Sequence, residues 1–467
     1  MLERISRFFK SDKNSNSAGA YIYGPSEHCL SPDMINRDAR NVVDVLQKAG
    51  FEAYVVGGCV RDLLLGLKPK DFDVATSAKP WEVKSLFRRS RIIGRRFQIV
   101  HVQFSREIIE VTTFRSNENQ NSNKNHRQQN DSGMLTRDNV FGSVEEDASR
   151  RDLTVNALYY DPSDNSIHDF TNGLDDIDDR IIRIIGDPST RFREDPVRLL
   201  RVARFAAKLG FDIESSTAKP MKHRAGDLQQ VSPPRLFDET LKLFMSGNGL
   251  TTFELLHEHK LFEHIVPELS PMLNDKQGTP LKLVRQALIN TDKRIRNKQR
   301  VTPAFIYAAL LWPVVQRLTS NYEKNGNSPP YALSKAAGDS IAAQIPVTAI
   351  PKRFTIPMRE IWDLQLHLKR RGGNRAKRLA EHPRFRAAYD FILLREQAGE
   401  DLGGLGDWWT TYQDANEDQR ESMAEEILSK DKRPKRRRRR RNSPKPDNSP
   451  KPDNSPKPDN NPNPKNG

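Results

Sequence analysis

The chain has 467 residues, of which 36% are hydrophobic and 29% are charged, and its formal net charge is +15 at pH 7. This length suffices for two or three folded domains, and the positive charge favours a polyanionic partner, nucleic acid first and an anionic membrane surface second. The two cysteines, Cys29 and Cys59, are too few for a disulfide framework or a zinc site and fit a reducing, cytoplasmic environment. No signal-peptide core is present near Met1, and no apolar run approaches the roughly 20 residues of a membrane span, so we expect a soluble protein.

The N-terminal region is predicted to change from an irregular leader to a helix. Residues 1–30 are polar and rich in Asn and Ser, which favours a flexible leader. From Ser31 onward the apolar spacing predicts a helix that ends at Gly50 and packs under the strand that follows. The apolar residues that set this spacing are Ile35, Val42, Val43, Val45 and Leu46.

The stretch Ala53–Ala78, AYVVGGCVRDLLLGLKPKDFDVATSA, carries the first chemical signal. It predicts a strand over Ala53–Val56, a Gly-Gly turn, a short helix over Arg61–Leu65, a loop and a second strand. Alternation in the second strand sends Asp71 and Asp73 to the same face. Two carboxylates on one exposed face repel each other, so they indicate a compensating cation, for which Mg²⁺ is the usual choice.

The Gly-Gly turn provides a second part of this candidate site. Gly57 and Gly58 leave backbone N–H groups free at the start of a helix, where phosphate binds readily. A phosphate cradle beside paired carboxylates is what nucleotidyl transfer requires. Either motif alone is common on solvated strand faces and in turns, and the order of the two along the chain makes the combination specific.

A hairpin is expected after this stretch. A helix over Pro80–Arg89 precedes two strands, Gln98–Phe104 and Ile108–Phe114. Glu110, in the second of these strands, is the natural third acidic residue of the site, with an ordinary surface carboxylate as the alternative. The segment Asn117–Asn130 is rich in Asn and Gln without periodicity, which predicts a mobile loop that borders the substrate channel.

The order of strand, Gly-Gly-x-Val-Arg-Asp, loop and Asp-x-Asp resembles the catalytic core of the polymerase β-like nucleotidyltransferases. It is most similar to the class that holds the bacterial poly(A) polymerases and the bacterial CCA-adding enzymes. The resemblance implies an α+β fold, with a head of mixed sheet and helices followed by an all-α neck and body. It also implies ATP as substrate and two Mg²⁺ ions, for which Mn²⁺ can substitute, held by Asp71 and Asp73 and completed by Glu110. In this family Gly57, Gly58, Arg61 and Asp62 would contact the nucleotide.

The segment Ser149–Tyr160, SRRDLTVNALYY, matches a second motif of the family, RRDxxxN. The resemblance implies that Arg151, Asp152 and Asn156 lie by the ribose and phosphates of the incoming nucleotide; a salt-bridged surface is the alternative. The pair His168-Asp169 is typical of HD phosphohydrolases, but no companion metal-binding histidines follow it. The region Asp169–Arg183 resembles the hinge between head and neck.

The segment Arg191–Phe211, RFREDPVRLLRVARFAAKLGF, predicts a helix with Asp195 as its N-cap, Pro196 at its first position and Gly210 at its end. Its spacing allows an i,i+3 ion pair between Asp195 and Arg198, and a capped amphipathic helix with this ion pair and no binding role is one interpretation. The EDxxRxxR pattern also matches the family motif that reads the Watson–Crick edge of the incoming base. On that match Glu194, Asp195 and Arg198 would select the nucleotide.

From Ser232 the sequence has a helical pattern to about Gly406. His257, His259 and His264 lie close together, but no carboxylate or Cys partner has metal-site spacing, so we expect ordinary helix surface. The basic sequence HLKRRGGNRAKR predicts phosphate contacts from Lys369, Arg370 and Arg371, with solvated charge as the alternative.

The composition changes after about Leu428. Lys432–Arg441 is almost wholly basic, and NSPKPD repeats follow from Asn442. Such a segment has too little apolar surface to fold, so we expect a disordered tail. Arg436, Arg437 and Arg438 in its basic block are expected to contact RNA.

The expected domains are a leader over residues 1–30, a catalytic head over 31–185, a base-binding neck over 186–270, an RNA-binding body over 271–428 and a tail over 429–467. The segment Ile92–Val102, IIGRRFQIVHV, resembles one that separates the poly(A) polymerases from the CCA-adding enzymes. The resemblance therefore implies in-line transfer of AMP from ATP to RNA 3′ ends, a reaction that promotes RNA decay, with the RNA-decay machinery as a partner. A CCA-adding tRNA nucleotidyltransferase and a non-catalytic RNA-binding adaptor are the alternatives.

Overall fold

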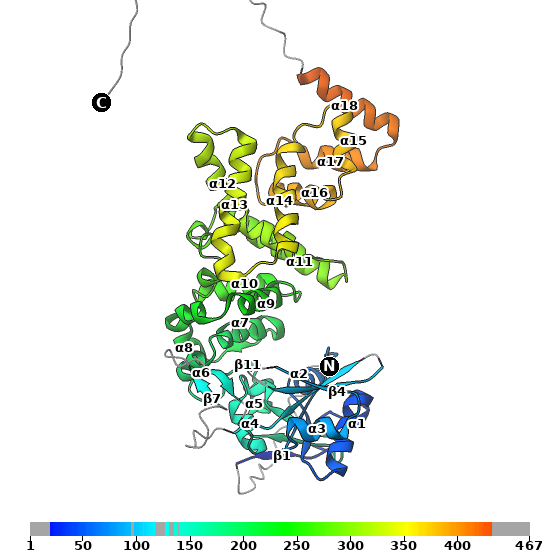
Figure 1. Cartoon of the computed structure of the whole chain (residues 1–467), viewed down its shortest axis with the longest axis vertical. Coiled ribbons are helices and arrows are strands. Elements are labelled where there is room, and N and C mark those ends of the chain that lie inside the picture. The colour runs from blue at the N-terminus through cyan, green and yellow to red at the C-terminus, as the bar shows by residue number, and fades with distance from the viewer. Residues whose placement is uncertain are drawn as a thin grey trace, which may run out of the picture.

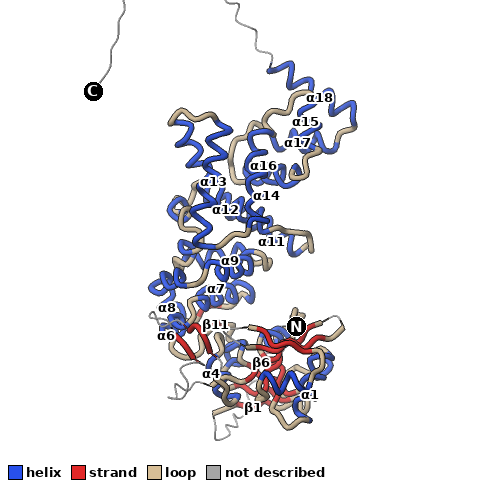
Figure 2. Tube along the Cα trace, in the orientation of Figure 1, coloured by secondary structure: helices blue, strands red, loops and turns tan. Residues whose placement is uncertain are grey.

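The computed structural model describes residues 19–94, 98–105, 107–116, 127–129, 135–138 and 140–431. The molecule is elongated, with a mixed α/β head at one end and a succession of helices that leads away from it (Figure 1). Strands are concentrated at the head end, whereas the rest of the described chain is helix and connecting loop (Figure 2). The predicted order of an α+β head followed by a helical neck and body is confirmed, except that the neck is not all-α, because it contains the two-residue strand β12 (Asp212–Ile213).

An eight-stranded sheet forms the head, in the order β1-β10-β9-β2-β3-β6-β5-β4. Its strands are β1 (Tyr21–Tyr23), β2 (Ala53–Val56), β3 (Asp73–Thr76), β4 (Ser90–Ile93), β5 (Ile99–Gln103), β6 (Ile108–Thr113), β9 (Leu158–Asp161) and β10 (Ser166–Asp169). Neighbouring strands run antiparallel except β3 and β6, which are parallel. A separate ribbon pairs β7 (Arg127–Gln129) with β8 (Leu135–Asp138).

The sequence explains the centre of this sheet. All four residues of β2 are apolar and buried, as a strand covered on both faces requires. On one face lie α1 (Arg37–Lys48), whose N-terminus is capped by the Asn36 side chain, and α3 (Pro80–Leu86). On the other face, β2 contributes the Tyr54 ring to a small aromatic cluster beside α4 (Val144–Arg150).

Three local predictions for the head need correction. The leader is shorter than expected, because Tyr21–Tyr23 pair with β10 as an edge strand. The second strand begins at Asp73, so Asp71 lies in the loop that leads into it. The loop predicted over Asn117–Asn130 lies largely outside the described residues, and Arg127–Gln129 within it form a strand.

Two short strands and several helices connect the head to the neck. These elements are α5 (Gly173–Asp178), β11 (Ile181–Ile182), α6 (Pro188–Glu194), α7 (Val197–Leu209), β12 (Asp212–Ile213), α8 (Ser215–Arg224), α9 (Pro233–Phe244) and α10 (Gly249–Glu258). β11 and β12 run parallel, so the end of α7 returns to the segment that leaves the head. Gly210 ends α7 with a left-handed backbone at φ 64°, as the predicted C-terminal glycine should.

The body consists of α11 (Thr279–Arg296), α12 (Pro303–Lys324), α13 (Pro329–Thr348), α14 (Lys352–His367), α15 (Asn374–Ala380), α16 (Phe385–Gln397), α17 (Leu405–Asp414) and α18 (Glu417–Asp431). One hydrophobic core continues from the head through the neck into α12, α13 and α14. A second core joins the C-terminal helices around Trp409, which is fully buried. None of the described helices is long and apolar enough to cross a membrane.

Candidate active site

Three carboxylates meet at one end of the parallel strand pair. Asp73 is the first residue of β3, and the register places it directly beside Glu110 of β6. Asp71 precedes the strand and is well exposed, with 73% of its side chain accessible, while Asp73 is partly buried. The structure therefore brings together the two aspartates and the third acidic residue that the sequence predicted.

The negative charge of this group is poorly compensated. Burial, followed by the neighbouring charges of Glu110 and Asp71, raises the pKa of Asp73 to about 6, and Arg151 offsets this only in part. Among the described residues Asp71 pairs with Lys70, whose amine lies at 3.8 Å and whose side chain is 93% exposed. His101 on β5 approaches Glu110 with its Nε2 atom at 3.3 Å from Oε1, without the geometry of a hydrogen bond.

These carboxylates suit a hard cation. Within the described residues, no group of three or more His, Cys, Asp or Glu side chains is arranged as a ready metal cage. Asp71 and Asp73 supply oxygen ligands only, and the raised pKa of Asp73 means that a cation there would relieve repulsion. Mg²⁺ commonly binds in this way, through one or two carboxylates and the phosphates of a substrate.

The Gly-Gly turn approaches the carboxylates closely. Gly57 has φ 87°, a backbone conformation that favours glycine, and it precedes α2 (Gly58–Leu64). A Cβ atom at Gly57 would lie 3.7 Å from Arg151 Nη1 and 4.0 Å from Asp73 Oδ2. The turn, the arginine and the carboxylate thus surround one small region, where a phosphate would meet the Arg151 guanidinium. The prediction of a free N–H group at Gly57 is wrong, because this group donates to the Leu158 carbonyl at 3.3 Å.

The RRDxxxN residues separate into two networks. The Arg151 Nε atom donates to the Tyr159 hydroxyl at 2.8 Å and to Asp147 at 3.2 Å, which fixes the side chain while Nη1 faces Gly57. Asp152 accepts a short charge-assisted hydrogen bond from Arg201 on α7. Burial alone would raise the pKa of Asp152, but the charges of Arg201 and Arg198 hold it well below its usual range.

Arg61 and Asp62 are part of the internal framework. Arg61 is only 1% exposed, and its guanidinium donates to Asn156 Oδ1 and, through Nε at 2.9 Å, to Asp62. Asp62 also accepts from Lys208 of α7 at 3.0 Å. These contacts connect α2 to the neck, and direct contacts of Arg61 and Asp62 with a nucleotide stay predictions.

The neck residues form ion pairs that differ from the predicted one. Helix α7 begins at Val197, and Pro196 occupies the N-cap position predicted for Asp195. Asp195 lies one residue earlier, and its Oδ1 still accepts from the Val197 N–H at 3.4 Å. Asp195 does not pair with Arg198; both of its oxygens accept from Arg235 of α9, each at 2.8 Å. Glu194 instead accepts from Arg198 at 3.2 Å and from Arg191 at 2.8 Å.

Arg191 and Arg235 are candidate functional residues that the sequence prediction missed. Arg191 donates to the main-chain carbonyls of Arg150 and Arg151, so it attaches the head motif to the neck. Arg235 comes from a helix whose sequence is that of an ordinary amphipathic helix. The i,i+3 spacing of Arg191 and Glu194 could have indicated their ion pair. The contacts of Arg191 with Arg150 and Arg151, and that of Arg235 with Asp195, join residues distant in the sequence and leave no local signal.

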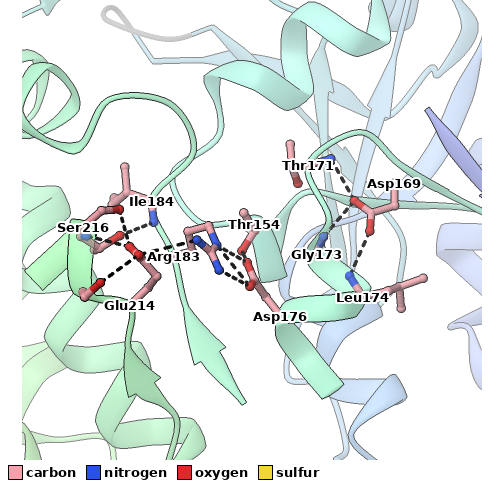
Figure 3. A network of polar contacts seen from close by, with 12 residues as sticks. Thr154, Asp169, Thr171, Gly173, Leu174, Asp176, Arg183, Ile184, Glu214 and Ser216 are labelled. Carbon is pink, nitrogen blue, oxygen red and sulfur yellow. Dashed lines mark hydrogen bonds and ion pairs between the residues drawn. The ribbon is translucent and has the colours of Figure 1, made fainter. Parts of the chain in front are cut away.

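A separate polar network joins the head to the neck beside this site (Figure 3). The buried Asp176 accepts from Arg183 at 3.1 Å and from the Thr154 hydroxyl at 2.6 Å, and Arg183 also approaches Glu214 at 3.7 Å. Gly173 packs so closely on Thr154 that a Cβ atom would lie 2.4 Å from its carbonyl oxygen. The region predicted as a hinge is therefore tightly packed in this conformation.

The predicted RNA contacts in the body have mixed surroundings. Lys369 and Arg370 are exposed after α14, whereas the Arg371 guanidinium stacks 5.0 Å from the Trp408 ring centre. Arg436, Arg437 and Arg438 lie outside the described residues. Contacts of all six residues with RNA stay predictions.

Comparison with protein families gives three matches along the chain. Residues 53–183 match the Poly A polymerase head domain, and residues 210–273 match the Probable RNA and SrmB- binding site of polymerase A. Residues 325–443 match the Polymerase A arginine-rich C-terminus. The matches follow one another in the order of head, neck and body.

Individual relatives give the same result. The chain is 45% identical to Poly(A) polymerase I of Salmonella typhi over 419 residues, which cover 89% of this chain and 90% of that protein. It is 44% identical to Poly(A) polymerase I of Haemophilus influenzae over 412 residues, covering 87% and 91%. Similarity to a CCA-adding enzyme of Staphylococcus epidermidis is lower, at 36% over 231 residues, and covers only 50% of this chain and 55% of that enzyme.

Solved structures share the fold at low sequence identity. A structure described as a tRNA-processing enzyme (apo form I) superposes with a TM-score of 0.58 at 22% identity, over 86% of this chain and 99% of that one. The Thermotoga maritima CCA-adding enzyme complexed with tRNA gives 0.54 at 18% identity, over 82% and 83%. These matches confirm the predicted fold class, and at such identities they carry the fold alone.

Proposed function

The chain belongs to the poly(A) polymerase I family, and from this premise we propose that it transfers AMP from ATP to the 3′ ends of RNA. The observation that carries the proposal is the group of Asp71, Asp73 and Glu110 beside the Gly-Gly turn, in a chain that matches poly(A) polymerases along nearly its whole length. Its intact carboxylates argue against a non-catalytic RNA-binding adaptor.

The proposed reaction is a single in-line displacement. The 3′-hydroxyl oxygen of RNA forms a bond to the α-phosphorus of ATP and loses its proton to solvent, the bond between that phosphorus and the bridging oxygen to the β-phosphate breaks, and pyrophosphate leaves. In such a reaction the enzyme contributes mainly by positioning the reactants and by stabilising charge. No covalent enzyme intermediate is needed.

The head residues would orient the reacting groups. Arg151 bonds to described residues through Nε and Nη2, so its Nη1, beside Gly57, is placed to receive phosphate oxygens next to Asp73. Asp71 and Asp73, with Glu110 beside them, would hold divalent cations, and two Mg²⁺ ions are the set that we propose. Bound there, such ions would polarise the α-phosphate and neutralise the charge that develops on the leaving group.

The neck residues would choose the base. Asp195 is oriented by Arg235, and Arg198 is held by Glu194, so both groups are restrained before a nucleotide binds. A carboxylate accepts from an exocyclic amine and a guanidinium donates to ring nitrogens, which suits recognition of adenine. Because Asp195 and Arg198 are each held in place by an ion pair, they support selection of ATP without rearrangement of the site.

RNA partners and cellular location are part of the same proposal. The exposed Lys369 and Arg370 and the basic block Lys432–Arg441 would contribute non-specific contacts to RNA phosphates. Association with the RNA-decay machinery would follow from a role in tailing RNA for degradation. A cytoplasmic location accords with Cys29 and Cys59, neither of which forms a disulfide.

One assay tests the function. The full chain is incubated with Mg²⁺ and each nucleoside triphosphate in turn, first with a generic single-stranded RNA and then with tRNA that lacks its CCA end. We expect long extension of both RNAs with ATP alone and slow incorporation of CTP. Ordered addition of C, C and A to tRNA, with no long tails on other RNA, would identify a CCA-adding enzyme instead.

A further inference from the structure

A second basic cluster surrounds Phe205 on α7, where the neck faces α2 of the head. The guanidinium carbons of Arg61, Arg201 and Arg204 lie 4.9, 5.3 and 4.8 Å from the centre of the Phe205 ring. Phe205 is only partly buried and packs against the main core with its remaining surface. Because an aromatic face attracts guanidinium groups, the ring holds three like charges close together.

Two of these arginines are already paired. Arg61 donates to Asp62, and Arg201 donates to Asp152. Arg204 differs from both, because it forms neither a hydrogen bond nor an ion pair with any described residue. Arg204 is partly exposed.

The charges around Arg204 favour an anion. Burial, followed by the neighbouring charge of Arg201, lowers the pKa of the Arg204 guanidinium, and Glu239 and Asp152 offset this only in part. Lys208, one turn further along α7, adds a further positive charge, and its amine lies 3.0 Å from Asp62. A partly buried cation with like charges around it is stabilised by an anionic ligand.

The cluster connects to the reacting end of the candidate active site. Gly57 lies beside Asp73, and a Cβ atom at the adjacent Gly58 would lie 3.3 Å from Arg61 Nη2, on the path toward Phe205. Arg204 follows Arg198 by six residues on α7, which is about 9 Å along a helix, so it lies well beyond the base-selecting end of α7. The α2 residues from Cys59 to Leu64 are buried, so a polyanion that leaves Asp73 would follow the surface of the neck, where Arg204 is partly exposed.

We propose that Arg204, supported by Arg201 and Lys208, binds a phosphate of the RNA strand upstream of its 3′ end. The inference rests on the proposed function, since it takes RNA as the polymer that reaches Asp73. The triphosphate of ATP has the same chemistry, but its expected contacts are at Gly57 and Arg151, next to Asp73. RNA, unlike ATP, continues past the reacting atoms with one negative charge per nucleotide, so a second phosphate-binding site would contribute to its affinity.

The test compares Arg204→Gln with Arg204→Lys and with Arg37→Gln as a matched control. Arg37 is exposed at the start of α1 and loses the same charge without touching the cluster. In the full chain, binding of a fluorescently labelled single-stranded oligoadenylate is measured over a series of salt concentrations, and KM is measured separately for ATP and for RNA. Extension of RNA by the wild type, measured in parallel, tests the proposed function by itself.

We expect Arg204→Gln to weaken RNA binding about tenfold, as loss of a hydrogen bond to a charged group does. The slope of log K against log salt should become shallower by about 0.7, the value for one phosphate contact to a single strand. Arg204→Lys should recover most of that slope, and Arg37→Gln should change neither quantity. KM for ATP should stay at the wild-type value.

Two results would overturn the assignment. A raised KM for ATP with unchanged RNA affinity would place the triphosphate at Arg204. Equal effects of Arg204→Gln and Arg37→Gln would mean that only net charge matters. Near-ultraviolet circular dichroism of Arg204→Gln must match that of the wild type; if it does not, Arg204→Lys alone decides, through its RNA affinity and ATP KM.

Discussion

The carboxylates of the head and those of the neck are treated in opposite ways by the surrounding structure. In the head, Asp73 lies beside Glu110 and near Asp71, and its pKa is raised to about 6. In the neck and the segment that contacts it, Asp195 receives two hydrogen bonds from Arg235, and the pKa of Asp152 is lowered by Arg201 and Arg198. The negative charge of the head carboxylates is only partly compensated, whereas Asp195 and Asp152 are already paired with arginines.

This difference indicates which partner each site requires. Carboxylates that repel one another are stabilised in their ionised form by a nearby cation, so the head site is suited to binding cations from solution. Charged groups that already have a partner of opposite charge can still form hydrogen bonds, so the neck site is suited to recognising a neutral base. The proposed polymerase activity requires both behaviours.

Asp73→Ala should have the largest effect, because it removes the more buried carboxylate of the cation site. We expect AMP incorporation to fall by at least about three orders of magnitude, since a catalytic metal supplies several kcal/mol of transition-state stabilisation. Binding of RNA should be nearly unchanged. Asp44→Ala, on the exposed surface of α1 beside Lys48, is the control. Substantial polymerisation by Asp73→Ala would refute the assignment of this site.

Arg198→Ala should reduce the choice between bases. A good bidentate contact to a base contributes about 1–3 kcal/mol of discrimination, so the ratio of kcat/KM for ATP and CTP should fall about 5- to 150-fold. Arg235→Gln, which removes the two charge-assisted hydrogen bonds from Arg235 to Asp195, should shift the same ratio in the same direction. If both variants kept the wild-type ratio while losing only stability, the ion pairs would be purely structural.

Asp73→Asn should stabilise the metal-free protein at high pH. A folded-state pKa of about 6 exceeds the usual value of 3.8, so the folded chain binds this proton more tightly than the unfolded chain does. Ionisation of Asp73 therefore costs stability as pH rises through this window, and above it the neutral variant should be more stable by on the order of 1–3 kcal/mol. The gain should disappear below about pH 4, where both states are protonated.

The measurement is urea unfolding of wild type and Asp73→Asn at pH 5 and pH 8 in the presence of a chelator. Adding Mg²⁺ at pH 8 should stabilise the wild type and leave Asp73→Asn nearly unchanged, because a ligand stabilises only the state that binds it. A wild type that is more stable than the variant at pH 8 without metal would contradict the idea of uncompensated charge.

Lys70→Ala should have the smallest effect. Its amine lies 3.8 Å from Asp71 and the side chain is 93% exposed, so solvent screens the interaction. We expect the free energy of unfolding to change by less than about 0.5 kcal/mol in the metal-free protein. A larger loss, measured by the same urea titration, would mean that Lys70 supplies the counter-charge that we assign to a bound cation.

The sequence by itself determined the parts of the site that are continuous along the chain. The Gly-Gly turn before a short helix, the nearby pair Asp71 and Asp73, and the strand that carries Glu110 can be predicted because a turn, a strand and a helix end depend on neighbouring residues. Gly57 with φ 87° is the clearest case, since its backbone conformation favours glycine. The match to a known family then supplied the roles.

Only the tertiary structure decided which charges meet. The parallel register of β3 and β6 places Glu110 beside Asp73. The packing of α9 brings Arg235 to Asp195, which therefore pairs with Arg235 and not with Arg198 as predicted. An i,i+3 spacing allows a pair, but a bidentate guanidinium from another helix offers a stronger one. Arg204 has no ion pair with a described residue for the same reason, because the acids near it, Glu239 and Asp152, are paired with Lys242 and Arg201. Partners that lie far apart in sequence leave no local pattern, so they become visible only when the chain has folded.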